Sequence, residues 1–256
     1  MRLEGKVVLI TGASEGIGAA CAAEFAAAGA KLSLTARSAE GLRRAGPNAL
    51  ITPGDLTDSA VRQSVVERTI ERFGRIDILV NSAGIGMYAQ SSNAPMDDVR
   101  RLMELNFFAL LGMIQLVAPH LRERRSGMIV NVSSIGGKMP LPWATLYSAS
   151  KYAVSALTEG LRMELRRDGV KTMLACPSYV TTGFQKHVIA GQPPAAIVRK
   201  RSSAITPAEC ARAIRRGVER EARTVMAPAS SWLLVLMARL FPWIVEARMA
   251  EMNGTA

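Results

Sequence analysis

Short apolar runs alternate along the chain with longer segments in which apolar residues recur every three to four positions. The runs are rich in valine, isoleucine and leucine and end at glycine or polar residues, which is typical of buried strands. The longer segments have the period of amphipathic helices. The pattern predicts strands near 7–11, 31–36, 49–53, 77–81, 127–133, 170–176 and 223–227. It predicts helices near 17–28, 38–45, 58–73, 97–123, 146–167 and 207–220.

Strands that alternate with helices indicate an α/β fold, in which helices cover both faces of a parallel sheet. We expect a doubly wound, Rossmann-type sheet of about seven strands in the order 3-2-1-4-5-6-7. In such a sheet a ligand binds at the carboxyl ends of the strands, where the strand order reverses. The length of 256 residues suits a single domain over 1–256.

Two segments depart from the regular alternation. Residues 183–206 contain two adjacent prolines, glycines and a basic run, and are expected to form a lid over the substrate, or else a surface loop without a role. Residues 229–256 form an apolar C-terminal extension whose apolar run is shorter than the ~20 residues of a membrane-spanning helix. Within it, 230–250 could pack on a partner subunit, cover an apolar pocket, or make a peripheral membrane contact.

The chain is basic, with a formal net charge of +11. Arginine clusters at 122–125, 199–201 and 212–223 are typical of solvated helix faces, and no nucleic-acid-binding motif accompanies them, so nucleic acid is not an expected partner. The three cysteines are far apart and the two histidines are isolated, so we expect reduced thiols, a cytoplasmic protein and no metal. The N-terminus leads into the first strand and does not have the pattern of a signal peptide.

A glycine-rich turn, Thr11-Gly-Ala-Ser-Glu-Gly-Ile-Gly18, lies between the first expected strand and the first expected helix. A strand, a glycine turn and a helix in this order place phosphate groups at the N-terminus of the helix. Gly12 would allow the tight turn, Gly16 would allow the backbone to approach a diphosphate, and Gly18 would allow the helix to pack closely on the strand. The turn therefore predicts a dinucleotide site.

A second set of residues can move a proton. Tyr147 and Lys151 are four positions apart and share one face of an expected helix. A neighbouring ammonium group stabilises a phenolate and lowers the tyrosine pKa. Ser134 ends an expected strand, where its hydroxyl could hold a carbonyl oxygen. With the glycine turn, these residues predict hydride transfer between a nicotinamide cofactor and a ketone or secondary alcohol.

The motifs together resemble those of the short-chain dehydrogenases/reductases in their compact, single-domain form, from about residue 5 to about residue 228. The motifs that carry the resemblance are Thr11–Gly18, Asp55–Asp58, Asn81–Gly84, Asn106 in Glu-Leu-Asn-Phe-Phe, Asn131–Ser134 and Tyr147–Lys151. The resemblance implies that Ser134, Tyr147, Lys151 and Asn106 are catalytic, with Asn106 holding a water for proton relay. It also implies a homodimer or homotetramer paired through the helices near 97–123 and 146–167, where Leu105, Phe108, Leu111 and Leu116 are available.

The resemblance also assigns the cofactor residues. Asp55 and Leu56 would frame the adenine, the Asn81–Gly84 turn would pack against the adenosine half, and Lys151 would reach the nicotinamide ribose. Thr182 would hold the nicotinamide carboxamide, although Ser178 replaces a glycine that is common nearby in relatives. The cofactor-binding set is Gly12, Ser14, Gly16, Ile17, Gly18, Arg37, Asp55, Leu56, Asn81, Ala83, Gly84, Tyr147, Lys151, Pro177, Val180 and Thr182.

The second strand indicates which nicotinamide cofactor binds. It ends without the acidic residue that grips the ribose 2′-hydroxyl of NAD, and Arg37, which suits a 2′-phosphate, follows it. NADP(H) is therefore favoured, with NAD(H) as the alternative, because Glu15 stands where NADP-preferring relatives often carry a basic residue. Met139, Pro140, Leu141 and Trp143 near Ser134 favour a lipophilic substrate. The alternative function is a non-catalytic NADP(H)-binding regulatory protein of the same fold.

Overall fold

A parallel sheet of seven strands in the order β3-β2-β1-β4-β5-β6-β7 forms the centre of the computed structural model, which describes residues 1–193 and 204–253. All neighbouring strands pair in parallel, so their carboxyl ends lie along one edge of the sheet. The expected fold class and strand order are confirmed. The strands are β1 (Val7–Thr11), β2 (Lys31–Ala36), β3 (Leu50–Pro53), β4 (Ile78–Asn81), β5 (Gly127–Val132), β6 (Val170–Pro177) and β7 (Thr224–Ala227).

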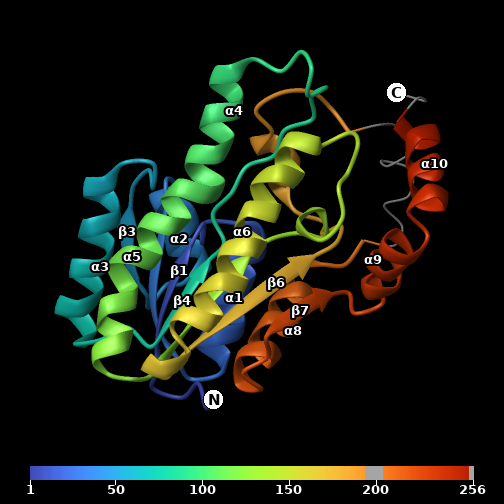
Figure 1. Cartoon of the computed structure of the whole chain (residues 1–256). Coiled ribbons are helices and arrows are strands. Elements are labelled where there is room, and N and C mark those ends of the chain that lie inside the picture. Colours follow the sequence, from blue (N-terminus) through green and yellow to red (C-terminus); the bar gives the residue numbers. More distant parts are fainter. Residues whose placement is uncertain (194–203, 254–256) are drawn as a thin grey trace.

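Helices cover both faces of the sheet (Figure 1). One face carries α1 (Gly16–Ala27), α2 (Ala39–Ala45) and α8 (Pro207–Glu219). The other carries α3 (Ser59–Phe73), α5 (Leu110–Glu123) and α6 (Thr145–Glu164). Side chains alternate between the two faces along each strand, so the two sides of one strand supply both cores. In β1, Leu9 packs with α5 and α6, whereas Val8 and Ile10 pack with α1 and α8.

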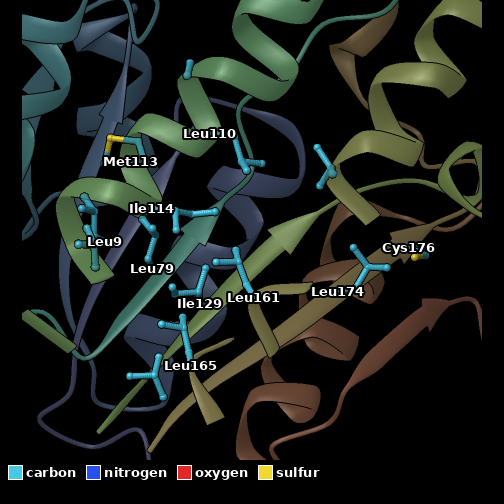
Figure 2. Packing of buried hydrophobic residues seen from close by; sticks show 14 of the residues in the cluster. Leu9, Leu79, Leu110, Met113, Ile114, Ile129, Leu161, Leu165, Leu174 and Cys176 are labelled. Atoms are coloured by element: carbon cyan, nitrogen blue, oxygen red, sulfur yellow. The ribbon is translucent and has the colours of Figure 1, made fainter. Parts of the chain in front are cut away.

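The core beneath α5 and α6 is well filled. Figure 2 shows Leu9, Leu79 and Ile129 of the sheet against Leu110, Met113 and Ile114 of α5 and Leu161 of α6. Burying a leucine or isoleucine side chain stabilises a fold by about 1.5–3 kcal/mol. The packed sheet therefore holds the residues at its carboxyl edge in fixed positions.

The expected helix at 97–123 is continuous but not uniform. It begins as α4 (Met96–Met103), changes to a π-helical turn, η1 (Glu104–Ala109), and continues as α5. The whole stretch is long and apolar enough to cross a membrane by length and composition alone, but 39% of its apolar window is buried within the protein. Its apolar residues include Met113 and Ile114, which belong to the core, and a core helix passes the same test.

The remaining helical segments are short or lie near the C-terminus. The expected helix at 146–167 is α6 followed by a 3₁₀ turn, η3 (Arg166–Asp168), and another 3₁₀ turn, η2 (Ile135–Gly137), follows β5. The apolar extension forms two helices that the sequence analysis did not assign, α9 (Ser231–Leu240) and α10 (Pro242–Asn253). Pro242 begins α10, where its missing N–H is not needed. Both helices stand beyond the β7 edge of the sheet (Figure 1).

The expected lid, 183–206, lies only partly within the described residues, because 194–203 fall outside them. It begins with the 3₁₀ turn η4 (Gly183–His187). Val188 then forms a parallel bridge with Gly86, and the N–H of Ile189 donates to the carbonyl of Gly86 over 2.9 Å. The described part of this segment is therefore attached to the loop that follows β4.

Candidate active site

A cavity of about 1730 Å³ opens along the carboxyl edge of the sheet, where the strand order reverses between β1 and β4. It extends from the glycine turn, past Ser134 and Tyr147, to α9 and α10. Every catalytic and cofactor-binding residue that the sequence analysis assigned lines this cavity, except Asn81 and Asn106. Of the apolar residues expected near the substrate, Leu141 and Trp143 line it, and Met139 and Pro140 do not.

The glycine turn is shaped by close backbone contacts. Gly12 has a φ of +66°, and a Cβ added there would lie 2.7 Å from the Cα of Ala83, so a larger residue would not fit. A Cβ on Gly18 would lie 2.2 Å from the carbonyl oxygen of Gly12. Gly16, by contrast, has room for a Cβ, 3.5 Å from the side chain of Thr182, and its glycine is favoured by a φ of +58°.

The N-terminus of α1 is available to an anion. No side chain caps this helix, and Glu15, which precedes it, is extended. The first N–H groups of a helix have no partner within the helix, and the helix dipole makes this end electropositive. The turn and the helix end therefore suit the diphosphate of a dinucleotide, which would lie over Ser14, Gly16, Ile17 and Gly18.

The far end of this groove holds the residues expected around an adenosine. Arg37 is exposed at the end of β2 and lines the cavity. Asp55 accepts hydrogen bonds from the N–H and the hydroxyl of Thr57, over 3.0 and 2.9 Å, which fixes the turn after β3. Leu56 beside it is buried. These groups could hold the adenosine half of a dinucleotide.

Tyr147 and Ser134 face the cavity from neighbouring elements. Tyr147 lies in the first turn of α6, and Ser134 comes directly after β5, where its hydroxyl accepts from the N–H of Gly136 over 3.0 Å. The side chains of Ser134 and Tyr147 are hydrogen-bonded to each other. The ammonium group of Lys151, one turn further along α6, lies 5.8 Å from the centre of the Tyr147 ring.

Burial is the main influence on the pKa values of Tyr147 and Lys151. It raises the pKa of Tyr147 to about 12, and the hydrogen bond from Ser134 only partly opposes it. It also lowers the pKa of Lys151 to about 8. The expected lowering of the tyrosine pKa by Lys151 is not seen, because desolvation of the phenolate is the largest influence on this pKa and raises it. At neutral pH Tyr147 is therefore a phenol that can donate a proton.

Lys151 is held from several sides. It is 5% exposed, and its Nζ donates to the carbonyl oxygen of Val132 over 3.1 Å. Its own carbonyl accepts from the hydroxyls of Ser133 and Ser155 over 2.9 and 3.0 Å. The sequence analysis missed Ser133 and Ser155, although Ser133 forms part of the Ser-Ser pair that ends β5. These bonds fix the α6 backbone against the sheet beneath Tyr147.

Asn106 connects two parts of the site from behind the cavity wall. Its side chain accepts from the N–H of Ile85 over 2.9 Å and donates to the carbonyl of Ile85 over 3.0 Å. It also donates to Ser150 Oγ over 3.0 Å, and Ser150 donates to the Tyr147 carbonyl over 2.7 Å. The π-helical turn places this fully buried amide. Asn106 thereby ties the loop after β4 to the first turn of α6.

Asn81 has a comparable position beneath the floor of the cavity. It is 2% exposed, and its amide donates to the side chain of Asn131 over 2.9 Å. Asn131 donates in turn to Thr158 Oγ1 over 2.9 Å. The pair joins the ends of β4 and β5 to α6. The pair holds in place the turn that the sequence analysis assigned to the adenosine half of the cofactor. Asn81 itself does not face the cavity.

Several cavity residues were not found from the sequence. Phe184 of the lid packs edge-on against Tyr147, with 5.8 Å between ring centres. Gln185 donates to the hydroxyl of Tyr88 over 2.8 Å, and His187 pairs with Glu15 of the glycine turn. No spacing in the sequence indicates these contacts, because they join loops that are far apart in the chain.

The groups that could bind metals or form disulfides are few. The described residues contain no group of three or more histidine, cysteine, aspartate or glutamate side chains that could hold a metal ion. Cys21, Cys176 and Cys210 are free and buried. Burial raises the pKa of each thiol, which makes all three poor nucleophiles.

Comparison with known proteins decides the family. The family model described as short chain dehydrogenase matches residues 6–193. The chain belongs to the short-chain dehydrogenases/reductases. These proteins are oxidoreductases, so the family indicated by the motifs is confirmed.

Individual relatives agree with this assignment. The chain is 34% identical to dehydrogenase/reductase SDR family protein 7-like of Anopheles gambiae, over 99% of this chain and 86% of that protein. It is also 34% identical to 11-beta-hydroxysteroid dehydrogenase-like 2 of Arabidopsis thaliana, over 94% of this chain and 80% of that protein.

Solved structures of short-chain dehydrogenases/reductases share the fold. A Burkholderia cenocepacia J2315 short-chain dehydrogenase in complex with NADP has a TM-score of 0.82 and 27% identity, over 97% of this chain and 99% of that one. A Burkholderia phymatum member in complex with NAD has a TM-score of 0.84 and 26% identity, over 93% of this chain and 94% of that one.

Proposed function

We propose that this short-chain dehydrogenase/reductase is an NADP(H)-dependent enzyme that reduces a ketone of a lipophilic substrate, or oxidises the corresponding secondary alcohol. One observation carries the proposal. The Tyr147 phenol is hydrogen-bonded to Ser134, above the buried Lys151 ammonium, in the cavity that begins at the uncapped end of α1. This arrangement joins a proton donor, a carbonyl-binding hydroxyl and a dinucleotide groove.

The chemistry follows from these positions. A nicotinamide cofactor in the groove would supply the hydride to the carbonyl carbon. Ser134 would donate a hydrogen bond to the carbonyl oxygen, where negative charge develops. Tyr147 would give its proton to that oxygen, and the Lys151 ammonium would stabilise the resulting phenolate. With a pKa of about 12, Tyr147 is protonated at neutral pH and so carries the proton that reduction requires.

The cofactor preference rests on Arg37. It is exposed at the end of β2, where a 2′-phosphate would lie, and no acidic residue takes that place. The two Burkholderia structures show that similar proteins bind NADP or NAD. We therefore assign NADP(H) as the favoured cofactor, with NAD(H) as the alternative.

The lipophilic substrate is inferred from the far wall of the cavity. Leu141 and Trp143, just before α6, line one side of it. Apolar side chains of α9 and α10 line the other, including Met237, Val245 and Met249. A site for a sugar would need polar partners for the substrate hydroxyls. The space beyond Tyr147 therefore suits an alkyl chain or a fused hydrocarbon ring system.

The proposal is tested by NADPH consumption along a series of ketones and 3-oxoacyl compounds of increasing chain length. Each buried methylene adds about 0.8 kcal/mol at most, so kcat/KM should rise with length until the cavity is full. A matched sugar ketone should be a poor substrate. A flat profile, or better turnover of the sugar, would contradict the lipophilic assignment. Absence of NADPH consumption with every compound, despite NADPH binding, would instead favour a non-catalytic regulatory protein.

We further expect a cytoplasmic homodimer or homotetramer paired through α5 and α6. The available patch is smaller than the sequence suggested, because Leu105 and Leu116 pack against the chain's own core. Phe108 of η1, 51% exposed, and Met163 of α6, 74% exposed, remain available.

Light scattering at micromolar concentration should give two or four copies of the chain, and Phe108→Glu should shift the mass towards the monomer. Met96→Glu, at a similarly exposed methionine at the start of α4, serves as the control. A monomeric wild-type protein would contradict this expectation.

A further inference from the structure

The outer surface of α9 and α10 is unusually apolar. Twelve large hydrophobic side chains are exposed among the described residues, and eight of them lie between positions 232 and 244. A contiguous exposed apolar patch marks an interaction surface, because scattered single residues are the normal case. The eight are Trp232, Leu233, Leu234, Leu236, Leu240, Phe241, Trp243 and Ile244, which we call the C-terminal apolar surface.

This surface is held in a fixed place. Val235 of α9 and Met249 of α10 are buried in the same core as α5 and α6. Their neighbours on the helices therefore point outwards for a structural reason, and Leu233 remains 67% and Trp243 64% exposed. The two helices follow one another at the edge of the molecule, with α10 above α9 in the view of Figure 1.

The C-terminal apolar surface is continuous with the substrate cavity. Leu234 and Ile244 are exposed by 43% and 52%, and both also line the cavity. Met237 and Val245, on the inner sides of the same helices, line it further in. The mouth of the cavity beside α9 and α10 therefore opens at this apolar surface, and not only at the lid.

The charge of the chain and the length of the helices indicate what binds the C-terminal apolar surface. The protein carries a net charge of +11, so an anionic surface attracts it. With 10 residues, α9 is too short to span a bilayer, which needs about 20. Trp232 and Trp243 are of the residue type that prefers the lipid–water interface. The two helices themselves carry exposed Arg239 and Arg248 and also exposed Glu246 and Glu251, and Arg248 pairs with Glu251 over 2.7 Å, so the attraction comes from the charge of the whole protein.

We propose that the C-terminal apolar surface docks on an anionic lipid bilayer, and that lipophilic substrate enters the cavity beside Leu234 and Ile244 directly from the lipid. The docking is independent of catalysis. The entry route rests on the proposed function, because it requires a lipophilic ketone as the substrate.

The test measures co-sedimentation of the full chain with phosphatidylcholine vesicles, with and without phosphatidylglycerol. Wild-type protein should bind the anionic vesicles, and salt should weaken this binding. The double variant Leu233→Gln and Leu236→Gln changes residues that do not line the cavity, and should lower the partition coefficient by roughly tenfold to a hundredfold. The control variant Met96→Gln removes another exposed apolar side chain, away from this surface and from the expected subunit contact, and should bind as wild type does.

Two further measurements separate the outcomes. Turnover of a small water-soluble ketone should be equal in the wild type and both variants, which shows that they are folded and reports on the proposed activity alone. Turnover of a long-chain ketone supplied in vesicles should fall only in the Leu233/Leu236 variant. Vesicle binding that is unchanged in this variant would overturn the docking. The docking would also be overturned if the wild-type protein did not bind vesicles but self-associated in light scattering, and the variant lost this self-association.

Discussion

Replacing Tyr147 by phenylalanine should lower kcat by roughly 10²–10⁴-fold, the usual contribution of a positioned proton donor. The substitution removes the hydroxyl that is hydrogen-bonded to Ser134 and leaves the ring against Phe184. Cofactor affinity should therefore change little. The measurement is steady-state reduction of a ketone that the wild type turns over, with NADPH binding followed by fluorescence.

Tyr152→Phe is the matched control, because Tyr152 lies on the same helix but is 41% exposed. It should retain full activity. Lys151→Ala should lose activity and also weaken NADPH binding, since this ammonium group would serve both the phenolate and the ribose. A Tyr147→Phe enzyme with near-normal kcat would disprove the assignment of the proton donor.

Removing the Arg37 side chain should abolish most of the preference for NADPH over NADH. A charge-assisted hydrogen bond to a 2′-phosphate contributes about 1.5–3 kcal/mol, or roughly 10–150-fold in Kd. Wild-type protein should show a preference of this size, and Arg37→Ala should bind NADPH more weakly with little effect on NADH. Dissociation constants for both cofactors, measured at one ionic strength, give the answer.

Arg43→Ala provides the comparison for Arg37→Ala. Arg43 is exposed on α2 nearby but does not line the cavity, so its loss removes the same charge without the contact. Its effect on the cofactor preference should be small. Equal binding of NADPH and NADH by the wild type would refute the assignment of Arg37.

The central strands were predictable from the sequence because they are buried on both faces. Such strands are apolar up to a polar residue that ends them, as in Val7–Thr11 and Ile78–Asn81. Residues with local spacing were predictable too, since Tyr147 and Lys151 are one helical turn apart. The glycine turn was recognisable because its strand and its helix flank it directly.

The remaining features depend on contacts that no local pattern encodes. A π-helical turn adds one residue to a helical turn, and the apolar period around Asn106 does not show it. The partners of the lid, such as Glu15 with His187, are 172 positions apart. The expected lowering of the Tyr147 pKa was wrong, because the spacing of the residues shows the nearby cation but not the desolvation of the phenolate.

The residues that line the cavity come from two different parts of the chain. The glycine turn, Ser134, Tyr147 and Lys151 all lie within the residues that the family model matches, 6–193, whereas α9 and α10 lie beyond them. Substitutions in α9 and α10 can therefore reshape one apolar wall of the cavity without touching the proton donor or the residues that support it.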